Sequence, residues 1–203
     1  MSLVIYFINL AHRKDRLKHM LDLSKHMQMP FQRINAVHNP DNPAQGCTES
    51  RIKALEKFQA TGEDRCLLLE DDFEPKCDPE FFAAALRVLP LSLPKEWDCV
   101  YLSHTATEPP GQIPSGSDLL VQLIDCLGGA ACLIRKKFVQ PLLEAHAKAL
   151  LTGMPSDVAV RSILPFYQVY APTGDVLLGK QMPSFSDIEK RFVDYEKEQV
   201  RAR

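Results

Sequence analysis

Three acidic residues stand side by side in the middle of the chain. Glu70, Asp71 and Asp72 directly follow Cys-Leu-Leu-Leu at 66–69, an apolar run that predicts a short buried strand. Strand alternation would place Glu70 and Asp72 on one side of that strand and Asp71 on the other. Two carboxylates at the end of a strand suit a hard divalent cation with oxygen ligands, such as Mg²⁺ or Mn²⁺. A solvated acidic turn leading into the next helix is the alternative interpretation.

The segments around this acidic triplet alternate between strand-like and helix-like patterns. Apolar runs predict strands at 3–10, 31–37, 66–69, 97–102, 119–127, 130–134 and 167–171. Helical spacing of apolar residues predicts helices at 14–26, 52–62, 79–89, 136–151 and 157–164, with a charged surface helix from 187 onward. Asp78 and Pro79 are typical of a helix start, as N-cap and first helical residue. Pro and Gly indicate loops at 38–46 and 103–117.

This alternation of elements predicts an α/β fold with a Rossmann-like, mostly parallel sheet that is flanked by helices. In such a sheet, ligands bind outside the carboxyl ends of the strands. The acidic triplet follows a predicted strand directly, so it is expected to lie at a binding site.

Composition and charge narrow the class of protein. The chain has 203 residues, of which 45% are hydrophobic and 25% charged, as expected for one globular domain. Its formal net charge of -2 argues against a nucleic-acid partner bound through a basic surface. No apolar stretch approaches the roughly 18 residues of a membrane span, and the N-terminus reads as a strand rather than a signal peptide. The six cysteines lack CxxC and zinc-site spacing, so reduced thiols and a cytoplasmic location are expected.

The chain resembles glycosyltransferase family 25, the galactosyltransferases of the lipopolysaccharide and collagen types. The resemblance rests on motifs that follow the family's order: 4–10 (VIYFINL) with Arg13, Asp15 and Arg16; 30–37 (PFQRINAV); Gly46, Cys47 and Ser50; 68–72 (LLEDD); 97–102 (WDCVYL); 128–134 (GGAACLI); Pro155 with Asp157; and Gln181 with 186–188 (SDI). The chain departs from the family at Arg51, where a histidine is usual, and at His38-Asn39, which replace an acidic residue. These departures affect the loop at 38–51 and leave the acidic triplet intact.

The resemblance implies a single GT-A-like domain over 1–203, with a nucleotide-binding half at about 1–102 and an acceptor half at about 103–203. It implies transfer of galactose or a related hexose from a UDP-sugar to a glycan acceptor such as lipopolysaccharide, with inversion at the anomeric carbon. A bound Mn²⁺ or Mg²⁺ would neutralise the departing diphosphate. Asp72 is expected as the first metal ligand and Glu70 as the second, with Asp71 nearer the donor ribose or sugar.

The same resemblance suggests further site residues. An inverting transfer needs a base for the acceptor hydroxyl, and Asp157 holds the matching position. Asp187 is expected to contact the metal or the donor. For both aspartates, a helix N-cap is the structural alternative. Asn9, Arg13 and Arg16 are expected at the donor, although the two arginines, at i and i+3, would also suit a solvated basic helix face. Gly128 and Gly129 permit close backbone approach to the donor, or form a hairpin turn.

Two other functions remain open at this point. One is a non-catalytic nucleotide-sugar-binding or interaction protein of the same fold, which the change to Arg51 would favour. The other is a nucleotidyltransferase, which is disfavoured because residues 9–13 contain no glycine for a phosphate loop. The acceptor would contact the variable loops at 38–51 and 103–117. Membrane contact is expected only through that acceptor, and the oligomeric state is left open.

Overall fold

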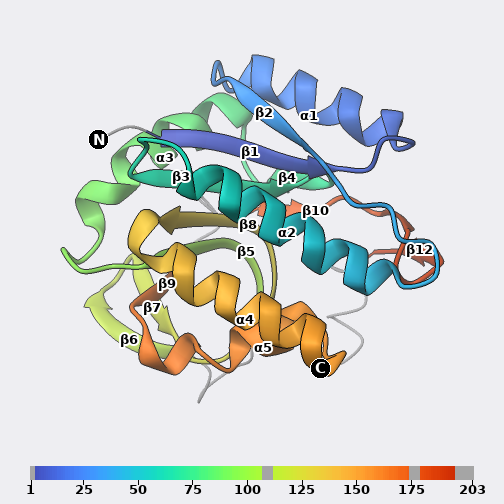
Figure 1. Ribbon diagram of the computed structural model, residues 1–203. Coiled ribbons are helices and arrows are strands. Elements are labelled where there is room, and N and C mark those ends of the chain that lie inside the picture. The colour runs from blue at the N-terminus through green and yellow to red at the C-terminus, as the bar shows by residue number, and fades with distance from the viewer. Residues whose placement is uncertain (1–2, 107–111, 174–178, 195–203) are drawn as a thin grey trace.

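The computed structural model describes residues 3–106, 112–173 and 179–194, and within them the expected α/β class is confirmed. Eight strands form the central sheet in the order β2-β1-β3-β8-β5-β9-β7-β6 (Figure 1). They are β1 (Leu3–Asn9), β2 (Phe31–Asn35), β3 (Arg65–Glu70), β5 (Cys99–Ala106), β6 (Gln112–Ser117), β7 (Leu120–Leu123), β8 (Cys126–Arg135) and β9 (Val169–Pro172). Two short antiparallel pairs lie outside it, β4 (Phe73–Pro75) with β10 (Gly179–Gln181) and β11 (Ser184–Ser186) with β12 (Arg191–Val193).

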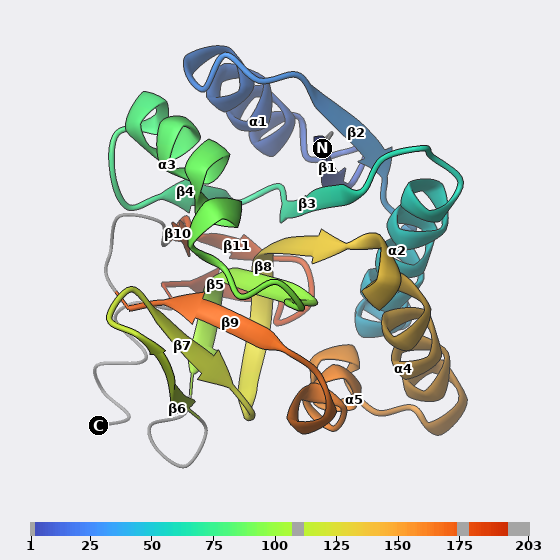
Figure 2. The same cartoon turned by 90° about the vertical axis from the view of Figure 1, so that its left-hand side faces the viewer.

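Helices cover both faces of the sheet (Figure 2). One face carries α1 (Lys14–His26) and α3 (Pro79–Ser92); the other carries α2 (Pro43–Gln59), α4 (Val139–Thr152) and α5 (Ser156–Arg161). The 3-10 helices η1 (Lys136–Phe138) and η2 (Leu164–Phe166) flank the last two. Apolar side chains fill each interface, with Phe82 buried under α3 and Phe58 buried under α2. No helix in the described ranges is long and apolar enough to cross a membrane.

The sheet is mixed in direction rather than mostly parallel. β1 pairs in parallel with β2 and β3, and β5 pairs in parallel with β9. β8 lies between β3 and β5 and is antiparallel to both. Helices α1 and α2 join the first three strands and return the chain for parallel pairing, whereas the described residues between β5 and β8 form the strands β6 and β7. The apolar pattern of a strand does not encode its direction, so the sequence could not show that β8 is antiparallel to its neighbours.

Two predicted loops are shorter than expected. α2 begins at Pro43, because the Asn42 side chain caps it and accepts a hydrogen bond from the Gln45 N–H at 3.1 Å. The loop expected at 38–46 therefore ends at Asn42. Within the loop expected at 103–117, the described residues extend β5 and form β6.

Two other expected features are wrong. Residues 187–190 form the turn of the β11–β12 hairpin instead of starting a surface helix, because Phe185 pairs with Phe192 across that turn. The rest of the expected helix, from 195, lies outside the described residues. The turn proposed at Gly128 and Gly129 is absent from this position, because both glycines lie inside β8.

The start of α3 agrees with the sequence prediction. The Asp78 carboxylate accepts hydrogen bonds from the backbone N–H groups of Glu80 at 2.9 Å and Phe81 at 3.3 Å. Pro79 occupies the first turn, where its missing N–H has no consequence. The cap therefore satisfies amides that lack a partner within the helix.

Replacing Asp78 with alanine should lower the free energy of unfolding by about 1 kcal/mol, because the capped amides lose their acceptor. D78N keeps a side-chain oxygen and is the matched control, which should lose only a fraction of that amount. Urea unfolding followed by circular dichroism measures both variants. An equal loss in D78A and D78N would contradict the capping role.

Candidate functional site

Two parallel strands bring polar residues together at their carboxyl ends. β1 and β3 are neighbours, and they end at Asn9 and Glu70. Because β3 stops at Glu70, Asp71 and Asp72 lie in the turn before β4. The prediction that strand alternation separates Asp71 from Asp72 is therefore wrong, and Arg16 contacts both of them.

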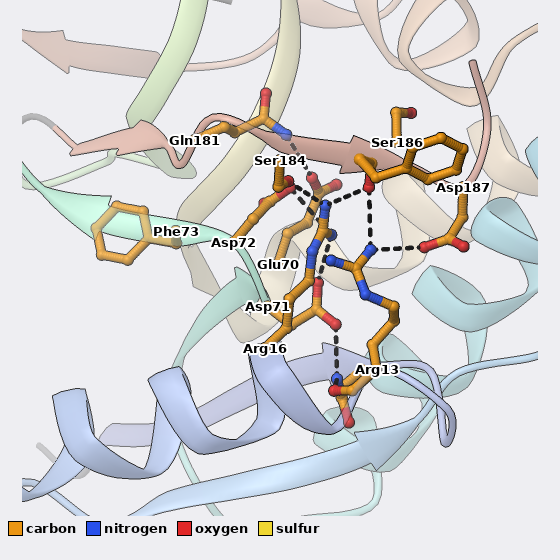
Figure 3. A network of polar contacts seen from close by, with 12 residues as sticks. Arg13, Arg16, Glu70, Asp71, Asp72, Phe73, Gln181, Ser184, Ser186 and Asp187 are labelled. Atoms are coloured by element: carbon orange, nitrogen blue, oxygen red, sulfur yellow. Dashed lines mark hydrogen bonds and ion pairs between the residues drawn. The ribbon is translucent and has the colours of Figure 1, made fainter. Parts of the chain in front are cut away.

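Arg16 of α1 is the centre of the polar network (Figure 3). Its Nη1 donates to Asp71 Oδ1 at 2.8 Å and lies 3.1 Å from Asp72 Oδ2. Its Nη2 donates to Ser184 Oγ at 2.6 Å and to the Phe185 carbonyl at 3.3 Å. One guanidinium thus joins the acidic turn after β3 to strand β11.

Asn9 connects this network to the sheet. Its side-chain amide donates to Asp71 Oδ2 at 2.7 Å and to the Arg13 carbonyl at 3.1 Å. Asn9 is buried, and Asp71 is only 7% exposed. Both oxygens of Asp71 therefore accept a hydrogen bond, one from Asn9 and the other from Arg16.

Asp187 connects the β11–β12 hairpin to the segment that follows β1. Its Oδ2 accepts from Arg13 Nη1 at 2.8 Å, and its Oδ1 lies 3.3 Å from His12 Nε2. The alternative role of Asp187 as a helix N-cap does not hold, because the residue lies in a turn. The structure thus brings together five residues predicted for the donor site: Asn9, Arg13, Arg16, Asp71 and Asp187.

Glu70 has separate partners from its two acidic neighbours. Its Oε1 forms an ion pair with Arg51 Nη2, from the middle of α2. Its Oε2 accepts from Gln181 Nε2 at 3.2 Å. Arg51 Nη2 also donates to the Gly129 carbonyl of β8 at 3.3 Å. The sequence marked Arg51 only as a departure from the family, and it gave no indication of this pairing.

Burial controls the ionisation of the acidic turn. It raises the pKa of Asp71, even though Arg16 acts in the opposite direction. Burial, followed by the charges of Glu70 and Asp71, raises the pKa of Asp72 to about 7. Asp72 therefore loses its proton only near neutral pH, and a further cation beside it would favour the charged carboxylate.

A cavity of about 200 Å³ opens beside these residues. Its polar lining includes His12, Arg16, Arg51, Glu70, Asp71, Asp72, Gln181, Ser184, Asp187 and Lys190. Its apolar lining includes Ile8, Val37, Pro40, Pro43 and Ile188. Apolar side chains together with a few charged groups are typical of a site for a small, partly charged molecule.

The carboxylate oxygens of the acidic turn differ in whether they are free to bind a divalent cation. Both oxygens of Glu70 and of Asp71 are engaged by protein donors. Asp72 Oδ1 is buried and accepts no hydrogen bond from the described residues. In the same part of the chain, no three His, Cys, Asp or Glu side chains are grouped to hold a metal by themselves. Asp72 therefore fits a cation that takes its other ligands from substrate phosphates and water, as Mg²⁺ commonly does.

The remaining predicted residues lie around a second cavity of about 30 Å³. Asp157 and Gly128 line it, and neither lines the larger cavity. Asp157 is not the N-cap of α5, which is Pro155. Gly129 has a φ of 131°, and an added Cβ would lie 3.2 Å from the Tyr101 ring, so this position favours glycine. The glycines therefore lie behind Arg51 rather than in the network around Arg16.

Sequence reasoning missed two members of the site and the role of a third. Ser184 contacts Arg16 but is far from it in sequence. His12 was given no role, although it lies beside Asp187. Gln181 was named only as part of a family motif, and the structure shows that it donates a hydrogen bond to Glu70. A lone Ser or His carries no spacing signal, so only the fold identifies these residues.

Known proteins resemble this chain in structure and not in sequence. No protein-family model and no curated protein sequence matches the chain. A glycosyltransferase involved in the glycosylation of the major capsid of PBCV-1 is similar in structure, with a TM-score of 0.51 and 12% identity. That similarity covers 97% of this chain and all of the other.

Two further solved structures have lower scores. A Drosophila β-1,4-galactosyltransferase 7, solved in complex with manganese, UDP-Gal and xylobiose, has a TM-score of 0.48 and 14% identity over 99% of this chain and 80% of that chain. A CTP:phosphocholine cytidylyltransferase from Streptococcus pneumoniae has a TM-score of 0.49 and 10% identity, with both chains fully covered.

The similarity to the PBCV-1 glycosyltransferase is one of fold. The chain shares with it an α/β architecture, which here consists of a mixed central sheet with flanking helices. At 12% identity this similarity carries neither the donor nor the acceptor.

Proposed function

We propose that the protein transfers a galactose-like hexose from a UDP-sugar to a glycan acceptor, with inversion, as a member of glycosyltransferase family 25. One observation carries the proposal. The larger cavity lies at the carboxyl ends of β1 and β3, and Asp72, which lines it, has a buried carboxylate oxygen that accepts no hydrogen bond from any residue the structure describes. Ligands of open α/β sheets bind at this position.

The walls of the larger cavity suit the two parts of a nucleotide diphosphate. The apolar wall, which includes Val37 and Pro43, can pack against a base. Arg51 also lines this cavity, and its planar guanidinium group matches phosphate oxygens. Asn9 and Arg16 hold Asp71 in place for contact with the ribose or the sugar.

Asp72, with Glu70 as a second ligand, would hold the divalent cation, Mn²⁺ or Mg²⁺. When bound, such a cation stabilises the negative charge that develops on the departing diphosphate. The buried Asp72 oxygen accepts no hydrogen bond from the described residues, which supports this role for Asp72. Glu70 would first have to leave its ion pair with Arg51.

We expect the acceptor to bind on the side of the smaller cavity. We assign Asp157 as the base that takes the proton of the acceptor hydroxyl, because it lies half-buried behind Arg51. In this arrangement the nucleotide half at about 1–102 contributes the metal ligands, and the acceptor half at about 103–203 contributes the base. A lipopolysaccharide-type acceptor would be the only link to a membrane.

A non-catalytic nucleotide-sugar-binding protein is the second candidate, and one observation favours it. Asp72 lines the larger cavity and Asp157 lines the smaller one, with Arg51 shared between them, so the larger cavity alone could bind a donor without any reaction. Turnover of any UDP-sugar would exclude this candidate.

The proposal is tested with a panel of UDP-hexoses. Hydrolysis or transfer is measured by release of UDP, with Mn²⁺ and with EDTA. Activity should require the cation, and D72N should lose at least about 100-fold in rate, a loss of roughly 3 kcal/mol of transition-state stabilisation. Full activity of D72N, or of the protein in EDTA, would overturn the metal assignment. The D157N variant tests the base assignment separately from the metal assignment, because it should lose turnover but keep its affinity for UDP.

A further inference from the structure

We propose that Arg51 binds the diphosphate of the donor, and that it does so by exchanging its ion pair with Glu70 for the phosphate. The inference rests on the proposed function, since it requires a nucleotide diphosphate in the larger cavity. It assigns a binding role to a residue that sequence reasoning treated only as a departure from the family.

The position of Arg51 suits this role. Arg51 extends from α2 and lines both the larger cavity and the smaller one behind it. Its side chain is 16% exposed, so it lies at the wall of the cavity and not in bulk solvent. A charge-assisted hydrogen bond is stronger in such a partly buried place than at an exposed surface.

The other two arginines near the site, Arg13 and Arg16, are each held by two carboxylates. Arg16 holds Asp71 and Asp72, whose side chains are only 9% and 8% exposed. Moving Arg16 to a phosphate would leave both of these carboxylates buried and unpaired, which is costly. Arg13 pairs with Asp15 and Asp187 and is not part of the cavity wall. Arg13 and Arg16 are therefore poorly placed to exchange partners.

Arg51 can exchange its partner at lower cost. The side chain of Glu70 is 27% exposed, so water can solvate its carboxylate after Arg51 leaves. Glu70 also keeps a second donor, because Gln181 Nε2 contacts its other oxygen at 3.2 Å. Both oxygen contacts that the described residues make with Arg51 use Nη2, and a guanidinium presents several N–H groups in a planar fork. This fork matches two phosphate oxygens at once.

The exchange would also change the site around Arg51. Glu70 would be released beside Asp72, and together they supply the pair of carboxylates expected for the cation. Arg51 would also move away from the smaller cavity, which Asp157 lines. Binding of the donor would thus assemble the metal ligands and open the route to the proposed base.

A double-mutant cycle tests the exchange, with UDP as the probe and isothermal titration calorimetry as the readout, in EDTA and in Mn²⁺. R51M should weaken UDP binding by about 10- to 100-fold, as expected for the loss of a charged hydrogen-bonding group. In EDTA, E70Q should tighten UDP binding several-fold, because it removes the competitor for Arg51. In the R51M background, also in EDTA, E70Q should no longer tighten binding, and this non-additivity is the signature of the exchange. In Mn²⁺, E70Q also removes the proposed second metal ligand, so the exchange is read from the titrations in EDTA.

Two controls accompany the cycle. R161M removes a partly buried arginine that pairs with Asp125 and lines neither cavity, and it should leave UDP affinity unchanged. Thermal unfolding of each variant confirms that the fold is kept. R51K is the second variant if R51M does not fold, and it should lose part of the affinity because lysine lacks the fork.

The outcomes are distinct. If wild-type protein binds no UDP in either condition, the proposed function fails and the inference fails with it. If wild-type protein binds UDP and R51M binds it equally well, the inference is overturned while the proposed function stands. If E70Q tightens binding as much in R51M as in wild type, Glu70 acts through its own charge and the exchange is overturned.

Discussion

Replacing Arg16 with alanine is expected to destabilise the fold by about 3–5 kcal/mol, the range observed when one partner of a buried ion pair is removed. Arg16 is the cation that contacts both Asp71 and Asp72, and both carboxylates are nearly buried. The alanine variant would also lose the bond to Ser184 that holds strand β11. Stability and ligand binding should therefore fall together.

Urea unfolding at pH 7 measures this effect, and two variants serve as controls. R16K keeps a charge without the planar fork, so it should recover only part of the loss. K18A removes the exposed pair of Lys18 with Asp22 on the same helix, and it should leave the free energy of unfolding nearly unchanged. An R16A loss as small as that of K18A would mean that the acidic turn is stable without its arginine.

The sequence sufficed for the residues that follow a strand directly. Asn9, Glu70 and Asp71 stand at the ends of apolar runs, and parallel pairing of β1 with β3 brings such ends together. Arg16 was also predictable, because α1 begins just after β1 and presents its first turn to the same edge. Chemical type and position relative to a strand therefore located the core of the site.

The partners of these residues were not predictable from sequence. Glu70 pairs with Arg51, whose helical environment gives no hint of a carboxylate 19 positions away. Asp71 and Asp72 share one arginine because β3 ends at Glu70, two residues before the strand end that the alternation argument required. Strand β8 enters antiparallel between β3 and β5, and this is what places Gly129 and Asp157 behind Arg51. Pairings of this kind depend on long-range topology, which local patterns do not contain.

Stability is expected to fall steeply in acid because of a histidine that is buried in the core. His146 of α4 is 3% exposed, and its Nδ1 is buried with no hydrogen-bond partner among the described residues. Burial, followed by the charge of Arg51, lowers its pKa from 6.5 to about 3. The folded protein therefore keeps this imidazole neutral at a pH where the unfolded chain protonates it.

The direction of the pH effect follows from proton linkage. Above pH 6.5 His146 is neutral in both the folded and the unfolded state, so the full stability is present. As the pH falls from 6.5 towards 3, the unfolded chain binds a proton that the folded protein excludes, and each pH unit in this window costs about 1.4 kcal/mol. His104, whose pKa is lowered to about 4 by burial and by Lys76, should add to the same decline.

The variant His146→Leu isolates this contribution. Leucine fits the apolar surroundings formed by Leu142 and Ala145 on the same helix, and it cannot titrate. Urea unfolding of wild type and H146L between pH 7.5 and 4 should give a stability difference that grows in favour of H146L as the pH falls. H26Q changes an exposed histidine at the end of α1 and should leave the wild-type profile unchanged. A difference between wild type and H146L that is constant across this window would show that His146 is protonated equally in the folded and the unfolded protein.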